Sequence, residues 1–444
     1  MSLWNVTTIG ELCLNVSSGG TPKSTNEEYY GGDIPWLNTK EINFNRIYDT
    51  EKYITQEGFE NSAAKWVKKD SVIVAMYGAT AAKVAMNMIN LTTNQACCNL
   101  TIDKSLANPK FVYYYIYGNY ERLLNLSSGA AQQNLNSNII KKFPISIPPL
   151  DIQNNIVNLL STIDDKIELN QKINKHLEQQ LLEIFDSWFF KFELSDEFIE
   201  SSLGSIPKGW SIDNLGSKKS CSIIGSGIDD FDNQKIYIAT ADVDNSTITN
   251  NETLITIGNK PSRANMQPVE KSIWFAKMID SRKLMMVDDY CYDLLNNYIF
   301  STGFCGLKCE EEYFYYLWTF LLTDTFNTIK NNFCTGTTMQ AINNKDTQLI
   351  EFVIPDIEIL SRFNEIAEPM YKKIYYNDLK IKNLQKLRDT LLPKLMSGEI
   401  DVSQLNCDLI ITSHYLSVRF PVIQHLFIKS YNLTSRLIDT AINI

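Results

Sequence analysis

Residues 129–148 read GAAQQNLNSNIIKKFPISIP, and residues 336–355 read GTTMQAINNKDTQLIEFVIP. The second stretch begins 207 residues after the first, and glycine, glutamine, asparagine and proline are among the residue types that recur in it at unchanged spacing. A long segment with helical spacing of its apolar residues follows each stretch. This duplication predicts a tandem molecule with two globular heads, each followed by a long helix. The recurring residues are Gly129, Gln133, Asn136 and Pro148, matched by Gly336, Gln340, Asn343 and Pro355.

The duplication extends to the beginning of each head. The pattern Trp4-x-Val6-x-x-Ile9-Gly10 recurs as Trp210-x-Ile212-x-x-Leu215-Gly216. Both heads also contain β-rich stretches, such as residues 71–76, separated by turn clusters. Each head carries an aromatic run, at residues 111–116 and 313–318. Such a run could stack on bases, but its spacing favours a packed amphipathic helix. The predicted fold class is therefore α+β.

The segments after Pro149 and Pro355 carry apolar residues three or four positions apart. This spacing gives each helix one narrow apolar stripe, as in coiled coils. We expect the two helices to pair with each other in an antiparallel coiled coil. Asn170 and Asn377 interrupt the stripes at matching repeat positions. Either they fix the register of the pair, or they lie on the surface one step off the seam.

Composition places the chain among ordinary soluble proteins. It has 444 residues, of which 44% are hydrophobic and 21% charged, enough for roughly two to four domains. No apolar run is long enough to span a membrane, and the start lacks the pattern of a secretion signal. The nine cysteines are scattered, which favours a reducing cytoplasm. The net charge of −10 does not exclude nucleic acid, because residues 1–150 are close to neutral while residues 197–356 are acidic.

The sequence offers no constellation for catalysis. Its three histidines form no HExxH pattern, and no Walker A loop or G-x-G-x-x-G stretch occurs. Cys97-Cys98 and Cys305-x-x-x-Cys309 loosely suggest a metal site, but buried free thiols explain them better. We therefore expect no catalytic residue, no metal and no cofactor.

Several short motifs occur in order along residues 1–406 and together resemble a known family. Each is weak alone, but the set, on an internal repeat of this period, resembles the specificity subunit of type I restriction–modification enzymes. The tail, residues 407–444, lies outside the resemblance. The motifs are Gly19-Gly20-Thr21-Pro22, Ile34-Pro35-Trp36, Pro148-Pro149-Leu150-x-x-Gln153, Gly204-x-Ile206-Pro207-x-Gly209-Trp210 and Leu391-Leu392-Pro393-Lys394-Leu395-Met396-Ser397-Gly398-Glu399-Ile400.

The resemblance implies a non-catalytic, cytoplasmic protein that binds double-stranded DNA. Each head would be a target recognition domain for one half of a split sequence, and the paired helices would form a spacer between the half-sites. Methyltransferase subunits and restriction/translocase subunits would dock on this scaffold. The implied domains are a first target recognition domain (1–148), a first spacer helix (149–192), a second target recognition domain (193–356), a second spacer helix (357–406) and an unassigned tail (407–444).

Candidate DNA contacts follow from the chemistry of lysine, arginine and asparagine. In the first head they lie after the Gly19-Gly20 turn, after the Ile34-Pro35-Trp36 stretch, and in residues 78–83, which resemble a loop of the family. In the second head Arg263 suits guanine and Asn265 suits adenine, while the other cations suit phosphate. Alternatively, these side chains are solvated or paired with nearby acids. The candidates are Lys23, Lys40, Thr80, Lys83, Arg263, Asn265, Lys277, Arg282 and Lys283.

The repeated motifs at residues 129–136 and 336–343 recur although the candidate DNA loops differ. We therefore assign them to the junction between each head and its helix, in preference to a direct role in DNA binding. Two other functions stay open: a tandem protein-interaction scaffold without DNA contact, and a self-contained nuclease or methyltransferase with unfamiliar motifs.

Overall fold

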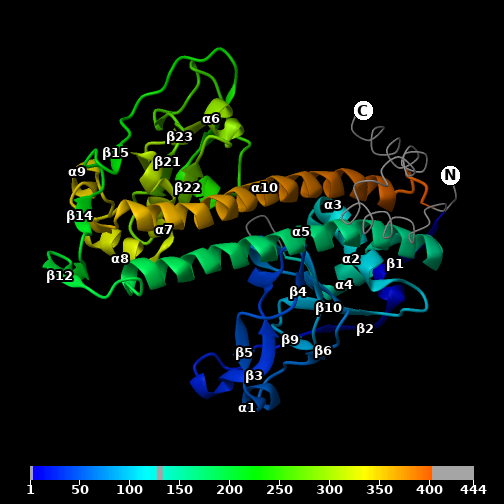
Figure 1. Cartoon of the computed structure of the whole chain (residues 1–444). Helices are drawn as coiled ribbons and strands as arrows, with labels where there is room; N and C mark the ends of the chain where they lie inside the picture. Colours follow the sequence, from blue (N-terminus) through cyan, green and yellow to red (C-terminus); the bar gives the residue numbers. More distant parts are fainter. Residues whose placement is uncertain (1–3, 128–133, 403–444) are drawn as a thin grey trace, which may run out of the picture. The chain divides into compact units, whose positions relative to one another are not determined.

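The computed structural model describes residues 4–127 and 134–402 (Figure 1). Gly129, Gln133 and the predicted tail 407–444 therefore lie outside the described residues. The chain forms two compact units. Unit 1 combines the residues up to Leu169 with those from Lys380 onward, and unit 2 comprises residues 170–379. Each unit thus contains one head and part of both long helices. The five-part division of the chain stays a prediction.

The first head, blue and cyan in Figure 1, is built on two sheets with the orders β2-β10-β7-β8-β4 and β5-β3-β9-β6. In the second sheet β3 and β9 are parallel. β7 is buried on both faces, which explains its continuous run of apolar residues. A separate pair joins β1 to β11. The strands are β1 (Asn5–Thr8), β2 (Cys13–Ser18), β3 (Tyr30–Leu37), β4 (Asn45–Ile47), β5 (Lys52–Ile54), β6 (Trp66–Val67), β7 (Val72–Ala75), β8 (Val84–Asn87), β9 (Leu91–Thr93), β10 (Cys97–Ile102) and β11 (Pro144–Ile147).

The second head repeats this topology. Its sheets have the orders β15-β24-β21-β22 and β19-β16-β23-β20, with β16 and β23 parallel, and β14 pairs with β25. The prediction of two related α+β heads is therefore confirmed. The strands are β14 (Ser211–Asn214), β15 (Cys221–Ile223), β16 (Lys235–Ile238), β17 (Val243–Asp244), β18 (Thr247–Ile248), β19 (Leu254–Ile255), β20 (Ala264–Met266), β21 (Ser272–Ala276), β22 (Leu284–Val287), β23 (Tyr298–Ser301), β24 (Phe304–Cys309) and β25 (Glu351–Ile354).

The two aromatic runs form buried helices, as predicted, and not stacking platforms. Residues 111–116 lie in α2 and are all buried in the core of the first head. Residues 314–318 lie in α7 and are all buried in the core of the second. The shorter helices are α1 (Gln56–Glu60), α2 (Pro109–Gly118), α3 (Tyr120–Leu124), α4 (Ser137–Lys142), α6 (Tyr292–Asn297), α7 (Phe314–Leu322), α8 (Asp324–Asn332) and α9 (Asn344–Thr347).

Two long helices follow the heads, as predicted. α5 spans Leu150–Phe185 and continues into a π-helical turn, Asp186–Phe190. α10 spans Ile357–Met396 and passes through Pro369, which has no backbone N–H to donate to the preceding turn. A short hairpin, β12 (Phe198–Ser201) and β13 (Gly204–Pro207), follows α5. Among the described helices, none combines the length and the apolar character that a membrane span requires.

The apolar stripes of α5 and α10 pack against each other within each unit. In unit 1, Ile163 and Ile167 are buried with Ile381. In unit 2, Phe185 lies 5.8 Å from Phe363 between ring centroids, and Asn174 bonds to Asn377. Within unit 2, then, a later residue of α5 meets an earlier residue of α10, so the two segments are antiparallel, as predicted.

A polar contact lies inside this seam in unit 2. Asn377 is fully buried and donates to Asn174 Oδ1 at 2.8 Å, and Asn174 donates to Asp378 Oδ1 at 2.7 Å. A buried amide that needs a polar partner disfavours slippage of one helix along the other. Of the two alternatives for Asn377, the structure therefore supports the register-fixing one. Asn170 is half-buried.

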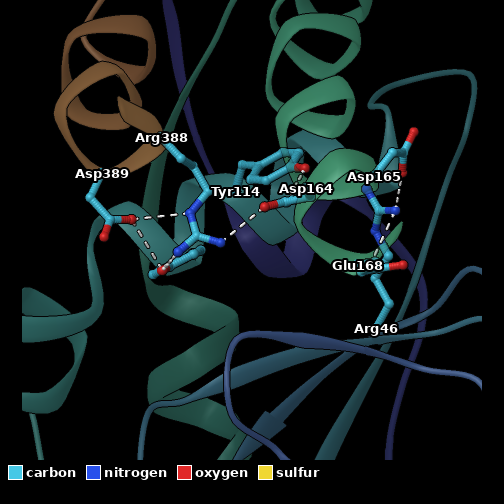
Figure 2. Close-up of polar contacts among 8 residues, drawn as sticks. Arg46, Tyr114, Asp164, Asp165, Glu168, Arg388 and Asp389 are labelled. Carbon is cyan, nitrogen blue, oxygen red and sulfur yellow. Dashed lines mark hydrogen bonds and ion pairs between the residues drawn. The ribbon is translucent and has the colours of Figure 1, made fainter. Parts of the chain in front are cut away.

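In unit 1 the long helices meet the first head through charged side chains, of which Arg46, Asp164 and Arg388 are largely buried (Figure 2). Asp164 of α5 accepts from the Tyr114 hydroxyl at 2.6 Å and from the Arg388 guanidinium of α10 at 2.9 Å. Arg388 also donates to the Tyr117 hydroxyl at 2.7 Å. Farther along α5, Asp165 and Glu168 pair with Arg46 of β4; the Glu168 contact is 3.5 Å. We call this set of contacts the ionic junction.

In unit 2 the equivalent face of α10 is aromatic. Tyr371, 207 residues after Asp164, shares a hydrogen bond of 2.8 Å with Thr319 and stacks on Tyr315 at 6.1 Å between centroids. Lys372 and Tyr375, at the positions of Asp165 and Glu168, contact the Tyr290 ring at 5.4 and 5.1 Å. We call this set the aromatic junction.

Candidate nucleic-acid interface

In the first head, the candidate residues gather at the connection between β7 and β8. The Lys83 carbonyl accepts from Ala75 N–H at 2.9 Å, and its ammonium donates to Asn43 Oδ1 at 2.7 Å. Thr80 ends a 3-10 turn (Gly78–Thr80) in the connection, and this turn contacts a second 3-10 turn (Thr39–Glu41) that carries Lys40. The structure thus brings Lys40, Thr80 and Lys83 together.

Lys40 and Lys23 are both exposed, but they differ in their surroundings. Lys40 forms an ion pair with Glu51, and both side chains are more than half exposed. Its hydrogen bond to Glu51 raises the pKa of Lys40. Since exposed ion pairs contribute little to stability, a DNA phosphate can replace Glu51 at little cost. Lys23 lies on the loop after β2, and none of the hydrogen bonds and ion pairs among the described residues joins it to the other three.

The β21–β22 connection is the counterpart in the second head. The Lys283 carbonyl accepts from Ala276 N–H at 2.9 Å, and its ammonium donates to the Thr240 carbonyl at 2.7 Å. Thr240 begins a 3-10 turn (Thr240–Asp242) after β16. Lys283 is therefore the structural equivalent of Lys83. Sequence comparison missed this match, because the span from Ala276 to Lys283 is one residue shorter than the span from Ala75 to Lys83.

The remaining candidates of the second head lie around this connection. The Lys277 ammonium donates to the Thr302 carbonyl at 3.3 Å, and Thr302 N–H donates to the Arg263 carbonyl at 2.9 Å. Arg282 is half-exposed and forms an ion pair with Asp324 of α8. Asn265 is half-buried in β20. Lys277 and Lys283 thus already bond to the backbone and Arg282 to a carboxylate, while the Arg263 side chain is exposed.

A buried lysine that the sequence did not single out holds the β21–β22 connection in place. Lys330 of α8 is 1% exposed and donates to the carbonyls of Ser281 at 2.6 Å and Met278 at 3.1 Å. Burial lowers the pKa of Lys330. Next to it, Asn331 donates to Asp280 Oδ1 at 2.7 Å, and Asp280 has a left-handed φ of 55°. No sequence pattern marks Lys330, because an isolated lysine normally indicates solvent exposure.

The repeated motif divides into two parts in the structure. Asn136 caps α4 by accepting from Ile139 N–H at 2.9 Å, and Asn343 caps α9 in the same way. These caps lie on the path to the long helices, as predicted. Gly336–Gln340 lies elsewhere: Ile279 N–H of the β21–β22 connection donates to the Gln340 carbonyl at 3.0 Å. The prediction that the whole motif belongs to the head–helix junction is therefore wrong for residues 336–340.

The described residues offer little for metal or nucleophilic chemistry. No group of three or more His, Cys, Asp or Glu side chains among them is placed to hold a metal ion. The described cysteines are all free, and burial raises the pKa of Cys98 to about 12 and that of Cys305 to about 11. These two thiols are protonated near neutral pH, when they are poor nucleophiles and poor metal ligands.

Comparison with known proteins agrees with this architecture. Residues 1–179 match the family model described as type I restriction modification DNA specificity domain. The MjaIX specificity subunit of a type I restriction enzyme from Methanocaldococcus jannaschii is 30% identical over 90% of this chain and 94% of its own length. The HindI specificity subunit from Haemophilus influenzae is 19% identical over 90% of this chain and its full length.

The fold has a solved counterpart. The crystal structure of the S subunit of a type I restriction–modification system from M. genitalium superposes with a TM-score of 0.50 at 17% identity. The match covers 88% of this chain and 96% of that one. At this identity the likeness concerns the fold alone. On the strength of its near full-length relative from M. jannaschii, the chain belongs to the family of type I restriction enzyme specificity subunits.

Proposed function

We propose that this chain is the DNA sequence-specificity subunit of a type I restriction–modification complex. Each head binds one half of a bipartite target in double-stranded DNA. The observation that carries this proposal is the contrast within the repeat: the two heads share the order of their sheets except for the edge strand β4, but their β7–β8 and β21–β22 connections differ in length and sequence. A shared frame with unlike connections suits two readers of unlike half-sites.

Within this proposal the cationic groups divide between two tasks. Lys40, Lys83, Lys277, Arg282 and Lys283 contact phosphate, with Lys23 and Thr80 at the margin of the first group. Arg263 and Asn265 contact base edges in the second half-site. Lys330 supports these contacts by fixing the connection before DNA arrives, which reduces the entropy lost on binding.

The chain itself is non-catalytic in this proposal, and its partners supply the chemistry. Methyltransferase subunits transfer the methyl group, and restriction/translocase subunits cleave. α5 and α10 dock these subunits and set the number of base pairs between the half-sites.

Methylation mapping tests the proposal. The full chain is purified alone and together with the methyltransferase subunit, and each preparation is incubated with unmethylated genomic DNA and methyl donor. We expect no methylation by the chain alone, and methylation of one bipartite motif by the complex. Methyl transfer by the chain alone would show that it is an enzyme. A complex that assembles but does not bind DNA would favour a protein-interaction scaffold without DNA contact, for which the acidic second head is the best support.

Head exchange tests the assignment of one half-site to each head. Replacing residues 1–148 by the matching segment of a related chain should change only the first half of the methylated motif. Deleting one heptad from both long helices should shorten the spacer and leave both halves unchanged. Altered half-sites in the heptad deletion would mean that the helices do not measure the spacing.

A further inference from the structure

The loop Thr335–Gln340 leaves and rejoins the second head at one point. Thr335 and Ala341 exchange two backbone hydrogen bonds, of 3.2 and 3.1 Å, which close the loop at its base. Gly336 has a φ of 130°, and a Cβ atom there would lie 2.6 Å from the Met339 carbonyl oxygen. A side chain at position 336 would therefore force the backbone to move, so the loop shape depends on glycine.

This loop adjoins the candidate DNA-binding residues. Ile279 N–H donates to the Gln340 carbonyl at 3.0 Å, and Ile342 N–H donates to the Lys277 carbonyl at 3.0 Å. The loop is thus bonded to both sides of Met278, in the connection that carries Lys277 and Arg282. Lys330 fixes the same connection through the carbonyls of Met278 and Ser281.

The loop displays hydrogen-bond donors and no negative charge. Thr337, Thr338 and Gln340 are exposed, and Met339 is 63% exposed. Within the described chain, none of the backbone N–H groups of residues 336–340 donates to a protein acceptor. Consecutive free N–H groups and hydroxyls are suited to phosphate oxygens, which only accept. The exposed Met339 side chain offers an apolar surface on which a sugar ring can pack.

The sequence repeat indicates which ligand the loop meets. Gly336 and Gln340 have identical counterparts in Gly129 and Gln133, although the neighbouring connections of the two heads differ. Two heads that read different bases still meet the same sugar–phosphate backbone. We infer that the loop Thr335–Gln340 contacts the DNA backbone beside the second half-site, and that it contributes affinity without base selectivity. This inference rests on the proposed function.

A charge pair at the exposed Thr338 tests the inference. Thr338→Lys and Thr338→Asp are prepared in the complex with the methyltransferase subunit, and affinity for a duplex of random sequence is measured over a range of salt concentrations. If phosphate lies at the loop, we expect Thr338→Lys to tighten binding and Thr338→Asp to weaken it, each about 3–10-fold. The lysine variant should also steepen the dependence of log K on log salt by roughly one. The ratio of affinities for target and random DNA should stay unchanged in both.

Matched controls separate a local effect from a general effect of charge. The same two substitutions are made at Thr247, an exposed threonine of β18 in the same head, and should change affinity less than the Thr338 pair. Equal effects at both positions, or none at Thr338, would overturn the inference. So would unchanged DNA binding with weaker binding of the methyltransferase subunit, which would assign the loop to a protein interface. If the wild-type complex itself showed no sequence preference, the proposed function would fail instead.

Discussion

The ionic junction of unit 1 and the aromatic junction of unit 2 occupy equivalent places in the repeat but use opposite chemistry. Asp164, Asp165 and Glu168 face the first head from α5, while Tyr371, Lys372 and Tyr375 face the second head from α10. The second helix of each junction differs in the same way. Arg388 of α10 in unit 1 corresponds to Leu181 of α5 in unit 2, which lies 207 positions earlier in the repeat. The repeat therefore preserves where a head contacts its helix, and not the side chains that make the contact.

Because the two junctions differ in chemistry, each head matches the face of only one of the two long helices. If the second head sat on α5, the half-buried carboxylate of Glu168 would meet the Tyr290 ring instead of the Arg46 guanidinium. A charge removed from water without a partner costs far more than a matched pair. The two junctions thus disfavour an exchange of heads between helices, and this can be tested by breaking one junction at a time.

The largest effect should come from Asp164→Leu. This change leaves the Arg388 guanidinium, whose side chain is 12% exposed, without its buried partner. We expect the free energy of unfolding of unit 1 to fall by about 3–5 kcal/mol. Hydrogen exchange of β7 and β10 peptides in increasing denaturant reports on unit 1 separately from unit 2. A loss confined to unit 2, or none at all, would contradict the assigned role.

Copying the aromatic junction into unit 1 should recover part of that loss. In Asp164→Tyr with Arg388→Leu, no buried charge is left unpaired. The half-exposed Asp389 loses its ion pair with Arg388, Tyr114 and Tyr117 each lose a hydrogen-bond partner, and the larger ring has to be accommodated. We expect a net loss of about 1–3 kcal/mol, smaller than for Asp164→Leu. A double variant less stable than the single one would mean that the ionic junction is not replaceable by apolar packing.

Alkaline pH should weaken the aromatic junction through Tyr371. Burial raises the pKa of Tyr371 well above its ordinary value of 10.0. The folded state thus holds the proton while the unfolded state releases it. Stability is therefore complete below pH 10 and falls as pH rises beyond it, by up to about 1.4 kcal/mol per pH unit for one tyrosine. Unfolding of unit 2 between pH 9 and 11 should be less steeply pH-dependent in Tyr371→Phe. Identical slopes would show that Tyr371 ionises equally in both states.

The smallest effect should be that of Tyr371→Phe near neutral pH. It removes only the hydroxyl bonded to Thr319 and keeps the ring on Tyr315. The expected loss in unit 2 is about 1 kcal/mol. Tyr376→Phe is the matched control on the same helix, because Tyr376 is 44% exposed, and it should leave stability unchanged. A larger loss in Tyr376→Phe than in Tyr371→Phe would show that the exposed hydroxyl stabilises unit 2 more than the buried one.

Most of the fold can be predicted from the sequence, because the fold depends on periodicity and repetition. The paired helices, the two α+β heads and the burial of both aromatic runs follow from spacing alone. The junction chemistry did not, since Asp164 and Arg388 are 224 positions apart and neither stands out from the solvated charges around it. An ion pair of this kind depends on tertiary packing that no local pattern encodes.

The candidate interface shows the same limit. The sequence predicts both Lys83 and Lys283 as DNA contacts. Their equivalence follows only from the structure, in which their carbonyls accept from Ala75 and Ala276 at the ends of β7 and β21. Gly336 and Gln340 repeat Gly129 and Gln133, but their nearness in sequence to the long helix suggests the junction, which is the wrong place for residues 336–340. Backbone bonds to Ile279 and Lys277 place these residues beside the cations instead.

The composition of unit 1 also has a consequence for synthesis on the ribosome. Its core includes Leu392, Leu395 and Met396 beside Phe111 and Leu160, so the first head is completed by residues that are made after the whole of unit 2. Unit 2 is one uninterrupted stretch and has all its residues earlier. The first head emerges first and closes last, and until then it exposes an unfilled apolar surface to the cell's chaperones.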